Sequence, residues 1–389
     1  MAQVPTGCHP SRENSRRVKW STIRFHPLGK QENAAVSIHP YRRLGRTGLS
    51  TSPLALGAGT FGKAWGEGWS IDKKEAEAIF HTFLDGGQNH IDVADFYQAG
   101  EAEEWVGEFL QTRGNRDRVI LTTKAALSTD PENANGGGNG RVHMMEALEA
   151  SLRRLKTDHV DLYYAHHWDT LTPVEEVMRT FEDMVRSGKV RYIGISNFPA
   201  WFLGQAHMFS RWQGIEPVAA LQMEYNLLER SIEREYLPFA ESTGTAVWAW
   251  SVLANGLLTG RYQIDLEGRK IVGEGRVTKT WVTDQSLDPF TPRALATLEV
   301  LAEISKELDS TPAQVALAWT LARPGIGGAV IGASKVSQVQ ASLQALELEL
   351  SSDQQDRLSQ ASSPPPCQPY AFHEGPLQQM IHGNAQAQP

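Results

Sequence analysis

Residues 158–197 read DHVDLYYAHHWDTLTPVEEVMRTFEDMVRSGKVRYIGISN and contain two apolar runs separated by an amphipathic segment. The runs Asp161–His166 and Tyr192–Asn197 have the length and composition of buried strands. Between them, Thr172–Pro173 is typical of an N-cap followed by proline at the first helical position, and Gly188 is typical of a helix end. Apolar residues recur between these signals at helical spacing, at Val174, Val177, Met178 and Phe181. The stretch therefore predicts two parallel strands joined by a helical crossover.

The same alternation continues on both sides of this stretch. Strand-like runs occur at Leu54–Phe61, His90–Ala94, Val119–Lys124, Asp161–His166, Tyr192–Asn197, Ala220–Tyr225, Ala246–Val252 and Gly328–Gly332. Eight such units in roughly three hundred residues predict an α/β fold, the (β/α)8 TIM barrel. Upstream, Thr47–Gly48 separates two short runs within residues 41–54, which predicts an N-terminal β-hairpin at the barrel bottom.

A doubly wound open sheet is the competing architecture. It requires a glycine-rich phosphate turn after its first strand, and Gly57–Gly62 resembles such a turn only loosely. No acidic residue stands at the right place on a following strand to complete that fingerprint. The pattern therefore favours the barrel, in which the chemistry belongs at the carboxyl ends of the strands.

The two ends of the chain differ in composition from its middle. Residues 1–40 are rich in arginine and lysine and show no period, so they are interpreted as a disordered or irregular extension, with a targeting segment as the alternative. Residues 362–389 are poor in core-forming side chains and predict an irregular tail. The barrel domain is expected to span residues 41–361. Within it, Ala254–Phe290 shows no clear elements and is interpreted as a lid or a surface insertion.

The composition narrows the class of protein. Hydrophobic residues make up 41% of the 389 and charged residues 21%, which is enough apolar material for a core. The net charge of -8 gives no electrostatic reason to expect a nucleic-acid partner. No apolar run approaches the roughly 20 residues that span a bilayer, so we expect no membrane association. Cys8 and Cys367 are the two cysteines of the sequence, and two thiols cannot stabilise a fold of this size through disulfides. Their scarcity fits a reducing compartment and predicts a cytoplasmic protein. The oligomeric state stays open.

Three of the predicted strands end in residues suited to a proton-coupled hydride transfer. Asp92 and Tyr97 lie in HIDVADFY, Lys124 in VILTTKA and His166 in DLYYAHHW. A phenol can give a proton to a developing alkoxide. An ammonium beside it would lower the pKa of the phenol, and a carboxylate would compensate the ammonium. Taken singly, these residues fit an ordinary buried salt bridge and a pocket-wall tyrosine equally well.

Several motifs, in this order, resemble those of the aldo-keto reductase superfamily. They are GQNHIDVADFY, TTKA, DLYYAHH, GISNF, LQMEYNLLER, WSVLANGLLTGRY and VIGASKVSQVQASL, and the resemblance runs from about Tyr41 to about Leu350. The ordered set is specific although each motif alone is common. The resemblance implies a barrel that binds a nicotinamide cofactor, usually NADPH, without a Rossmann domain. It also implies reduction of an aldehyde or ketone to an alcohol, or the reverse oxidation.

The same resemblance assigns the catalytic roles. Tyr97 matches the family's general acid/base, with Lys124 and Asp92 as the ion pair beside it. The family's histidine lies five positions after the aspartate of DLY, which selects His166 as the residue that orients the substrate oxygen. Because neighbouring strand residues face opposite layers, His167 is expected to pack toward the helices.

The resemblance also implies where the cofactor lies. The matching positions are Gly59, Thr60, Phe61, Asp92, Ser196, Asn197, Gln222, Trp250, Ser251, Leu253, Gly256, Leu258, Gly332, Ser334, Lys335, Gln338 and Ser342. Ser196, Asn197 and Gln222 match positions that hold the nicotinamide carboxamide, and Trp250 stands where many relatives stack a tyrosine on the ring.

The pyrophosphate and the 2′-phosphate fall on two later segments. Residues 251–258 match the pyrophosphate site, and the helix expected from Val336 offers backbone N–H groups that favour phosphate. Lys335 adds positive charge there, although it is shifted by one place from the basic residue of many relatives. NADP is therefore expected and NAD is not excluded. No metal is expected.

Two other functions compete with a reductase that acts on a small carbonyl or alcohol. A regulatory, cofactor-binding subunit of the same fold can retain the tetrad. A cofactor-independent phosphosugar barrel leaves Ser196, Asn197 and Gln222 unexplained. The substrate stays open. The candidates for an aromatic pocket are Phe61, Trp65, Phe96, Trp168 and the segment around Trp281.

Overall fold

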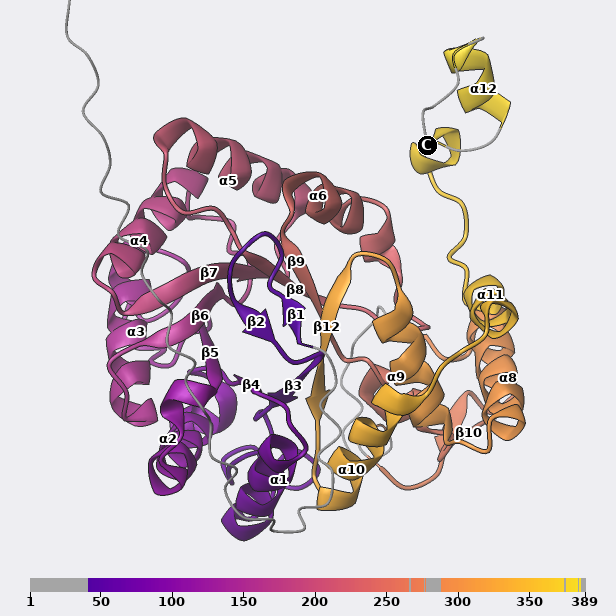
Figure 1. The fold of residues 1–389 in the computed structure, drawn as a ribbon, viewed down its shortest axis with the longest axis horizontal. Helices are drawn as coiled ribbons and strands as arrows, with labels where there is room; N and C mark the ends of the chain where they lie inside the picture. The colour runs from indigo at the N-terminus through magenta and orange to yellow at the C-terminus, as the bar shows by residue number, and fades with distance from the viewer. Residues whose placement is uncertain are drawn as a thin grey trace, which may run out of the picture. The chain divides into compact units, whose positions relative to one another are not determined.

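The computed structural model describes residues 41–265, 267–275, 277, 288–373, 376–383 and 385. It contains a closed barrel of parallel strands (Figure 1), with the order β12-β3-β4-β5-β6-β7-β8-β9. This confirms the predicted TIM barrel and excludes the open doubly wound sheet. The barrel strands are β3 (Leu54–Gly57), β4 (His90–Asp92), β5 (Ile120–Ala125), β6 (Val160–Ala165), β7 (Val190–Ser196), β8 (Ala220–Glu224), β9 (Ala246–Trp250) and β12 (Ile326–Gly332). The predicted extension at residues 1–40 lies outside the described residues.

Helices alternate with the strands from β3 to β9, and two consecutive helices stand on each side of β12 in the chain (Figure 1). They are α1 (Lys73–Asp85), α2 (Glu101–Arg113), α3 (Arg141–Leu155), α4 (Val174–Arg186), α5 (Ala200–Gln213), α6 (Tyr236–Thr243), α8 (Pro292–Glu307), α9 (Pro312–Ala322), α10 (Val336–Gln344) and α11 (Ser352–Ala361). In the tail, where irregular chain is predicted, Tyr370–Phe372 forms a 3-10 turn and Pro376–His382 forms the short helix α12. Every helix in the described part of the chain is too short or too polar to cross a membrane.

Helix α4 shows how the amphipathic pattern becomes packing. Its apolar stripe is buried against the barrel, with exposed fractions of 2% or less at Val177, Met178, Phe181 and Met184. Burial of each such side chain contributes roughly 1.5–3 kcal/mol. The helix begins one residue later than predicted, because Pro173 is the N-cap. The Thr172 hydroxyl instead donates to Asp169 Oδ2 at 3.0 Å, which orders the loop before the helix.

The predicted hairpin closes the amino end of the barrel. Strands β1 (Arg42–Arg43) and β2 (Ser50–Thr51) pair in antiparallel fashion. Leu44 beside them is 1% exposed and packs in the cluster that contains Trp248 inside the barrel. The Arg46 N–H donates to Gly244 O at 2.9 Å, just before β9. The carboxyl ends of the strands are therefore left for a site.

The stretch from Ala254 to Phe290 is more ordered than predicted. Ala254–Thr259 forms 3-10 turns, and β10 (Gln263–Asp265) pairs with β11 (Lys270–Val272) as a small antiparallel ribbon. The expectation of no regular elements is therefore wrong for this part. Residues 278–287, which include Trp281, lie outside the described residues.

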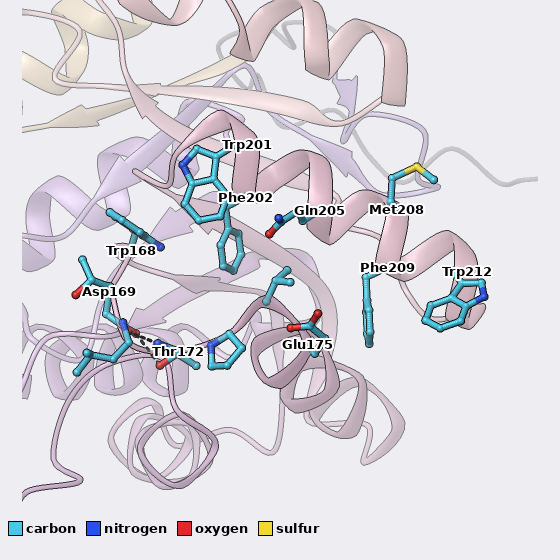
Figure 2. Close-up of a pocket in the computed structure, with 14 residues that line it drawn as sticks. Trp168, Asp169, Thr172, Glu175, Trp201, Phe202, Gln205, Met208, Phe209 and Trp212 are labelled. Atoms are coloured by element: carbon cyan, nitrogen blue, oxygen red, sulfur yellow. Dashed lines mark hydrogen bonds between the residues drawn. The ribbon is translucent and has the colours of Figure 1, made fainter.

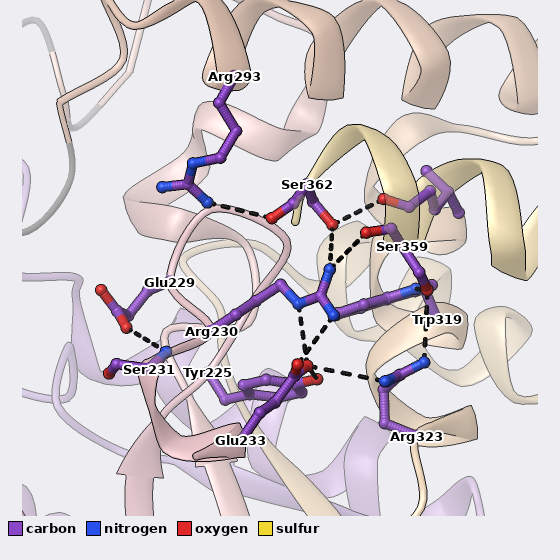
Figure 3. A network of polar contacts seen from close by, with 11 residues as sticks. Tyr225, Glu229, Arg230, Ser231, Glu233, Arg293, Trp319, Arg323, Ser359 and Ser362 are labelled. Carbon is purple, nitrogen blue, oxygen red and sulfur yellow. Dashed lines mark hydrogen bonds and ion pairs between the residues drawn. The ribbon is translucent and has the colours of Figure 1, made fainter. Parts of the chain in front are cut away.

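A buried polar network ties the loop after β8 to α11 and α9 (Figure 3). Arg230 forms a two-pronged ion pair with Glu233, at 2.9 and 2.8 Å. Its remaining nitrogen donates to Ser359 O at 2.7 Å and to Ser362 Oγ at 2.8 Å. The guanidinium also lies 5.4 Å from the centroid of the Trp319 ring. Every nitrogen of this guanidinium has a partner, so the network is a structural anchor.

Candidate active site

The four predicted catalytic residues meet at the carboxyl end of the barrel. Asp92 is the last residue of β4, and Lys124 is the residue before the end of β5. His166 follows directly after β6, and Tyr97 begins the 3-10 turn after β4. Since parallel barrel strands bring their carboxyl ends together, residues far apart in sequence share one site.

A buried ion pair lies at the centre of this site. Lys124 is fully buried, and its Nζ donates to Asp92 Oδ1 at 2.5 Å and to Val93 O at 2.9 Å. The same nitrogen lies 3.5 Å from Tyr97 Oη. Gln222 Nε2 donates to Asp92 Oδ2 at 2.7 Å, so both carboxylate oxygens are bonded. A buried carboxylate and ammonium are tolerated because each compensates the other.

Electrostatics keep Tyr97 protonated and Lys124 charged at neutral pH. Burial raises the pKa of the Tyr97 phenol, and Lys124 opposes this without reversing it. The expected lowering by Lys124 is therefore present but outweighed. Burial acts to lower the pKa of Lys124, yet Asp92 and Tyr97 raise it overall. The pocket thus presents a neutral phenol, which can donate a proton, next to a fixed positive charge.

His166 lies beside the phenol, and its ring centroid is 5.7 Å from that of Tyr97. It is 7% exposed, and its Nδ1 is buried with no hydrogen-bond partner among the described residues. Burial, with Lys124 and His167 nearby, lowers its pKa well below the usual value, so the ring is neutral near pH 7. A neutral imidazole can donate one hydrogen bond and accept another.

The prediction for His167 is wrong. Its ring stacks on His166 at 4.6 Å between centroids with 23° between planes, and the residue is exposed. Strand alternation does not apply to this pair, because β6 ends at Ala165 and both histidines lie beyond it.

The predicted carboxamide site is assembled around Asn197. Its backbone is left-handed, with φ 57°. Its Nδ2 donates to Ser196 Oγ at 2.9 Å, and its Oδ1 accepts from Trp250 Nε1 at 3.1 Å. These polar groups bond one another and would exchange partners to hold an amide. Gln222 belongs to the same pocket, although its nitrogen is committed to Asp92.

The predicted pyrophosphate segment contains three left-handed residues before its glycine. They are Ser251, Ala254 and Asn255, and Gly256 follows with φ 101°. Ser251 Oγ is buried without a partner among the described residues, which suits a phosphate oxygen. Leu253 is partly buried and packs against the core.

The backbone N–H groups of Leu258 and Gly256 have partners within the same loop. The Leu258 side chain is fully buried in the core, and its N–H donates to Leu253 O. The Gly256 N–H donates to the same carbonyl oxygen. Neither N–H is therefore available to a phosphate without rearrangement.

The predicted 2′-phosphate region lies at the start of α10, where Lys335 is the exposed N-cap residue. Gln338 Oε1 accepts from the Ser334 N–H at 2.7 Å, and the Ser342 hydroxyl donates back to Gln338 O at 2.9 Å. Gly332, exposed at the end of β12, has no neighbour where a side chain would begin. Ser334 and Ser342 thus have internal partners, and Lys335 supplies the positive charge.

The segment after β3 lies next to the Tyr97 ring. A Cβ at Gly59 would lie 3.8 Å from the Tyr97 ring, and the Thr60 hydroxyl donates to Ala333 O at 2.9 Å. Phe61 does not line a pocket. It is fully buried and packs edge-on against Phe109 at 6.3 Å. The sequence does not indicate that Phe61 is buried in the core, because Phe61 lies beyond the end of β3.

The aromatic residues expected around the substrate fall into two places. Trp65 lies beside the acid, with centroid distances of 5.9 Å to Tyr97 and 5.8 Å to Phe96. Trp168 instead packs edge-on against Trp201 of α5, in a groove of about 680 Å³ beside α4 and α5 (Figure 2). The expected single aromatic pocket is therefore divided, and the candidate near Trp281 lies outside the described residues.

Two buried polar residues near Tyr97 were not predicted from the sequence. Asp95 is 2% exposed, and burial, reinforced by Glu103, raises its pKa to about 7. Gln98 is 1% exposed and fully hydrogen-bonded. Both lie in or next to HIDVADFY, where a second carboxylate among apolar residues is a signal that could have found Asp95.

Comparison with known proteins adds an independent result. A model of the aldo/keto reductase family matches residues 53–363. Norsolorinic acid reductase of Aspergillus flavus is 33% identical over 79% of this chain and 76% of its own length. An aryl-alcohol dehydrogenase (NADP+) of Phanerodontia chrysosporium is 32% identical over 80% of this chain and 83% of its own. An uncharacterized oxidoreductase of Bacillus subtilis is 37% identical over 80% and 92%.

These matches agree with the barrel and with the residues gathered at its carboxyl end, and they support oxidation and reduction of carbonyl and alcohol groups. The match begins just before β3 and ends after α11, so it covers every barrel strand. On this evidence the chain belongs to the aldo/keto reductase family.

Proposed function

We propose that this protein transfers a hydride between NADPH and the carbonyl carbon of an aldehyde or ketone, with Tyr97 as the general acid. In the reverse direction Tyr97 acts as the base. The observation that carries the proposal is the buried Lys124 ammonium, which is bonded to Asp92 and lies 3.5 Å from Tyr97 Oη. Burial of an ion pair adds little net stability, so a fully buried pair that touches a phenol favours a chemical role.

The proposed step divides the work among four side chains. When bound, the cofactor supplies the hydride. Tyr97 Oη gives its proton to the carbonyl oxygen as negative charge develops there. Lys124 then stabilises the phenolate that remains, and Asp92 keeps Lys124 charged. His166, which is neutral, hydrogen-bonds to the same substrate oxygen and holds it within reach of Tyr97.

The fit to a nicotinamide cofactor rests on the polar atoms around the pocket. Ser251 Oγ is buried without a partner among the described residues, and Asn197 offers an amide whose present partners are side chains of the same pocket. At the start of α10, the Val336 N–H is already bonded to Glu75 Oε1 at 2.9 Å. Lys335 is therefore the group we assign to a 2′-phosphate. NADP is the proposed cofactor, with NAD as the alternative.

The proposed substrate class is an aromatic aldehyde or ketone. Trp65 and Phe96 form an aromatic wall next to the Tyr97 ring. Two of the relatives carry names that refer to an aryl alcohol and to norsolorinic acid. Aromatic rings pack well on aromatic walls, which favours such substrates over compact aliphatic ones. The scarcity of cysteine fits action in the cytoplasm.

Turnover measurements test this function. NADPH oxidation is followed with aromatic and aliphatic aldehydes and ketones, then with NADH, and the reverse reaction is followed with aryl alcohols and NADP+. We expect NADPH-dependent reduction of aromatic aldehydes. Flat traces with every carbonyl, despite tight NADPH binding, would contradict a reductase and indicate a regulatory cofactor-binding subunit.

A further inference from the structure

The residue after Tyr97 has a strained backbone. Gln98 has φ 53° and ψ 36°, and Ala99 follows with φ 56° and ψ 34°. This left-handed region disfavours residues that carry a Cβ, and neither residue is glycine. Such backbone persists only where the surroundings hold it in place. Ala99 is exposed, and besides its own backbone bonds this turn has the buried Gln98 side chain to hold it.

All the hydrogen-bonding positions of the Gln98 side chain are used. Nε2 donates to Gly59 O at 3.0 Å and to Trp69 O at 2.7 Å. Oε1 accepts from the Trp65 N–H at 2.9 Å and from Ser70 Oγ at 3.0 Å. A carboxamide offers two donor hydrogens and two lone pairs, and all four are engaged. The four partners belong to one loop, residues 58–72, between β3 and α1.

The two ends of this loop are bonded to each other, because the Ile71 N–H donates to Thr60 O at 3.1 Å. Its turns within residues 63–69 have N–O distances of 3.3 and 3.4 Å. Its other close bond to the segment after Tyr97 runs from the Lys63 N–H to Glu101 Oε2 at 2.6 Å. The approach also depends on Gly62, since a Cβ there would lie 2.4 Å from Gln98 Cβ. The segment that follows Tyr97 therefore bonds the middle of the loop, which includes Trp65.

We propose that Gln98 is a positioning residue that clamps Trp65 against Tyr97, and that this wall selects aromatic carbonyl substrates. The planes of the Trp65 and Tyr97 rings are 77° apart, and the backbone N–H of Trp65 donates to Gln98 Oε1. A flat substrate ring packed on Trp65 presents its carbonyl group to Tyr97 Oη. The proposed selection of aromatic substrates rests on the proposed carbonyl reduction. The proposed positioning of Trp65 by Gln98 does not depend on that activity.

Two glycine substitutions separate the clamp from the backbone strain. Gln98→Gly relieves the left-handed strain and removes four hydrogen bonds. Ala99→Gly relieves the same strain one residue later and removes none, so it is the matched control. Hydrogen–deuterium exchange of residues 59–71 should become at least about tenfold faster in Gln98→Gly and stay unchanged in Ala99→Gly, because exchange follows local opening. This measurement needs no turnover.

Steady-state kinetics with an aromatic and an aliphatic aldehyde then test the proposed selection of aromatic substrates. Gln98→Gly should raise the KM for 2-naphthaldehyde about tenfold, on the scale of a lost aromatic contact, and change kcat less than about threefold. Its kcat/KM for propanal, which has no ring, should change less than about threefold, and Ala99→Gly should match the wild type with both aldehydes. Trp65→Ala should reproduce the KM effect. The double variant should add nothing further, because both changes remove one contact.

Each outcome decides the proposal. Equal exchange and equal KM in the two glycine variants would overturn the clamp, and additive effects of Gln98→Gly and Trp65→Ala would show that Gln98 does not act through Trp65. If Gln98→Gly does not fold, Ser70→Ala removes one of the four bonds and must show the same pattern at smaller size. If the wild type reduces no carbonyl, the proposed function fails while the exchange result still judges the clamp.

Discussion

Two buried ion pairs in this protein look alike, yet their surroundings differ. Every nitrogen of the Arg230 guanidinium has a partner within the fold, although Nε of the neighbouring Arg323 has none among the described residues. Around Lys124 and Asp92, buried polar atoms of neighbouring residues have no partner within the described part of the chain. Among these atoms are His166 Nδ1, Asp95 Oδ1 and Tyr164 Oη, whose residues interact electrostatically with Lys124 or Asp92. Both places contain a buried cation, and they differ in how many of the surrounding buried polar atoms are left without a partner.

The difference implies opposite contributions to stability. A satisfied buried pair is destabilising to break, because its removal leaves the partner charge alone. An unsatisfied buried polar atom already destabilises the fold. Substitutions near the site should therefore raise stability and lower activity. Substitutions at the anchor should lower stability and leave activity largely intact.

The largest effect on stability is expected at the anchor. Arg230→Met should lower the free energy of unfolding by about 3 kcal/mol, since Glu233, which is 21% exposed, loses both bonds of the ion pair and keeps the Tyr225 hydroxyl and a 3.8 Å contact with Arg323. Activity per folded molecule should stay within a few fold. Urea denaturation measures the first and kinetics the second. The pair of Arg141 and Asp183, whose side chains are 49% and 45% exposed, is the control, and Arg141→Met should cost less than about 1 kcal/mol. Similar losses in both variants would remove the distinction.

Asp95 should give an effect of opposite sign that depends on pH. Its folded pKa is raised to about 7, so its contribution to stability is complete below about pH 4 and is lost as pH rises toward 7. Asp95→Asn removes that loss. The variant should equal the wild type near pH 4 and exceed it above pH 7 by a few kcal/mol at most, at about 1.4 kcal/mol per pH unit. Melting curves at several pH values measure this, and a pH-independent difference would refute it.

Tyr97→Phe should separate catalysis from stability. We expect kcat/KM to fall at least about 100-fold, the usual scale of a general acid, with NADPH affinity within a few fold. The matched control is Tyr225→Phe, which removes a hydroxyl bonded to Glu233 at the anchor. It should cost about 1 kcal/mol of stability and leave kcat/KM near wild type. Reduction by Tyr97→Phe at the wild-type rate would exclude Tyr97 from the mechanism.

The smallest effect concerns the cofactor at the start of α10. Lys335→Met should raise the Kd for NADPH roughly ten- to a hundredfold, the scale of a charge-assisted contact of about 1.5–3 kcal/mol. NADH, which lacks the phosphate, should bind almost unchanged. Fluorescence titration of both dinucleotides measures this. A solvated lysine without a role predicts no change for either, and equal weakening of both would reopen NAD as the natural cofactor.

The sequence predicts the features of this fold that follow a period. Each of the eight barrel strands overlaps its predicted run because buried strands and amphipathic helices leave regular patterns, and the tetrad follows from its place at strand ends. His167, Phe61 and Leu258 could not be placed, since their environment depends on where a strand stops and on neighbours from other elements. Gln98 leaves no pattern at all, because its partners belong to a loop far from it in sequence. The roles of the site residues stay predictions.

Closure of the barrel has a consequence for how this chain folds. Leu54 of β3 pairs with Ala329 of β12, so the first and last barrel strands depend on each other. During synthesis, β3 and its neighbours emerge long before β12 and expose an open sheet edge until that strand arrives. Such long-range pairing slows folding. A chain truncated before Ile326 should therefore aggregate through its free edges, even though every residue of the proposed tetrad would be present.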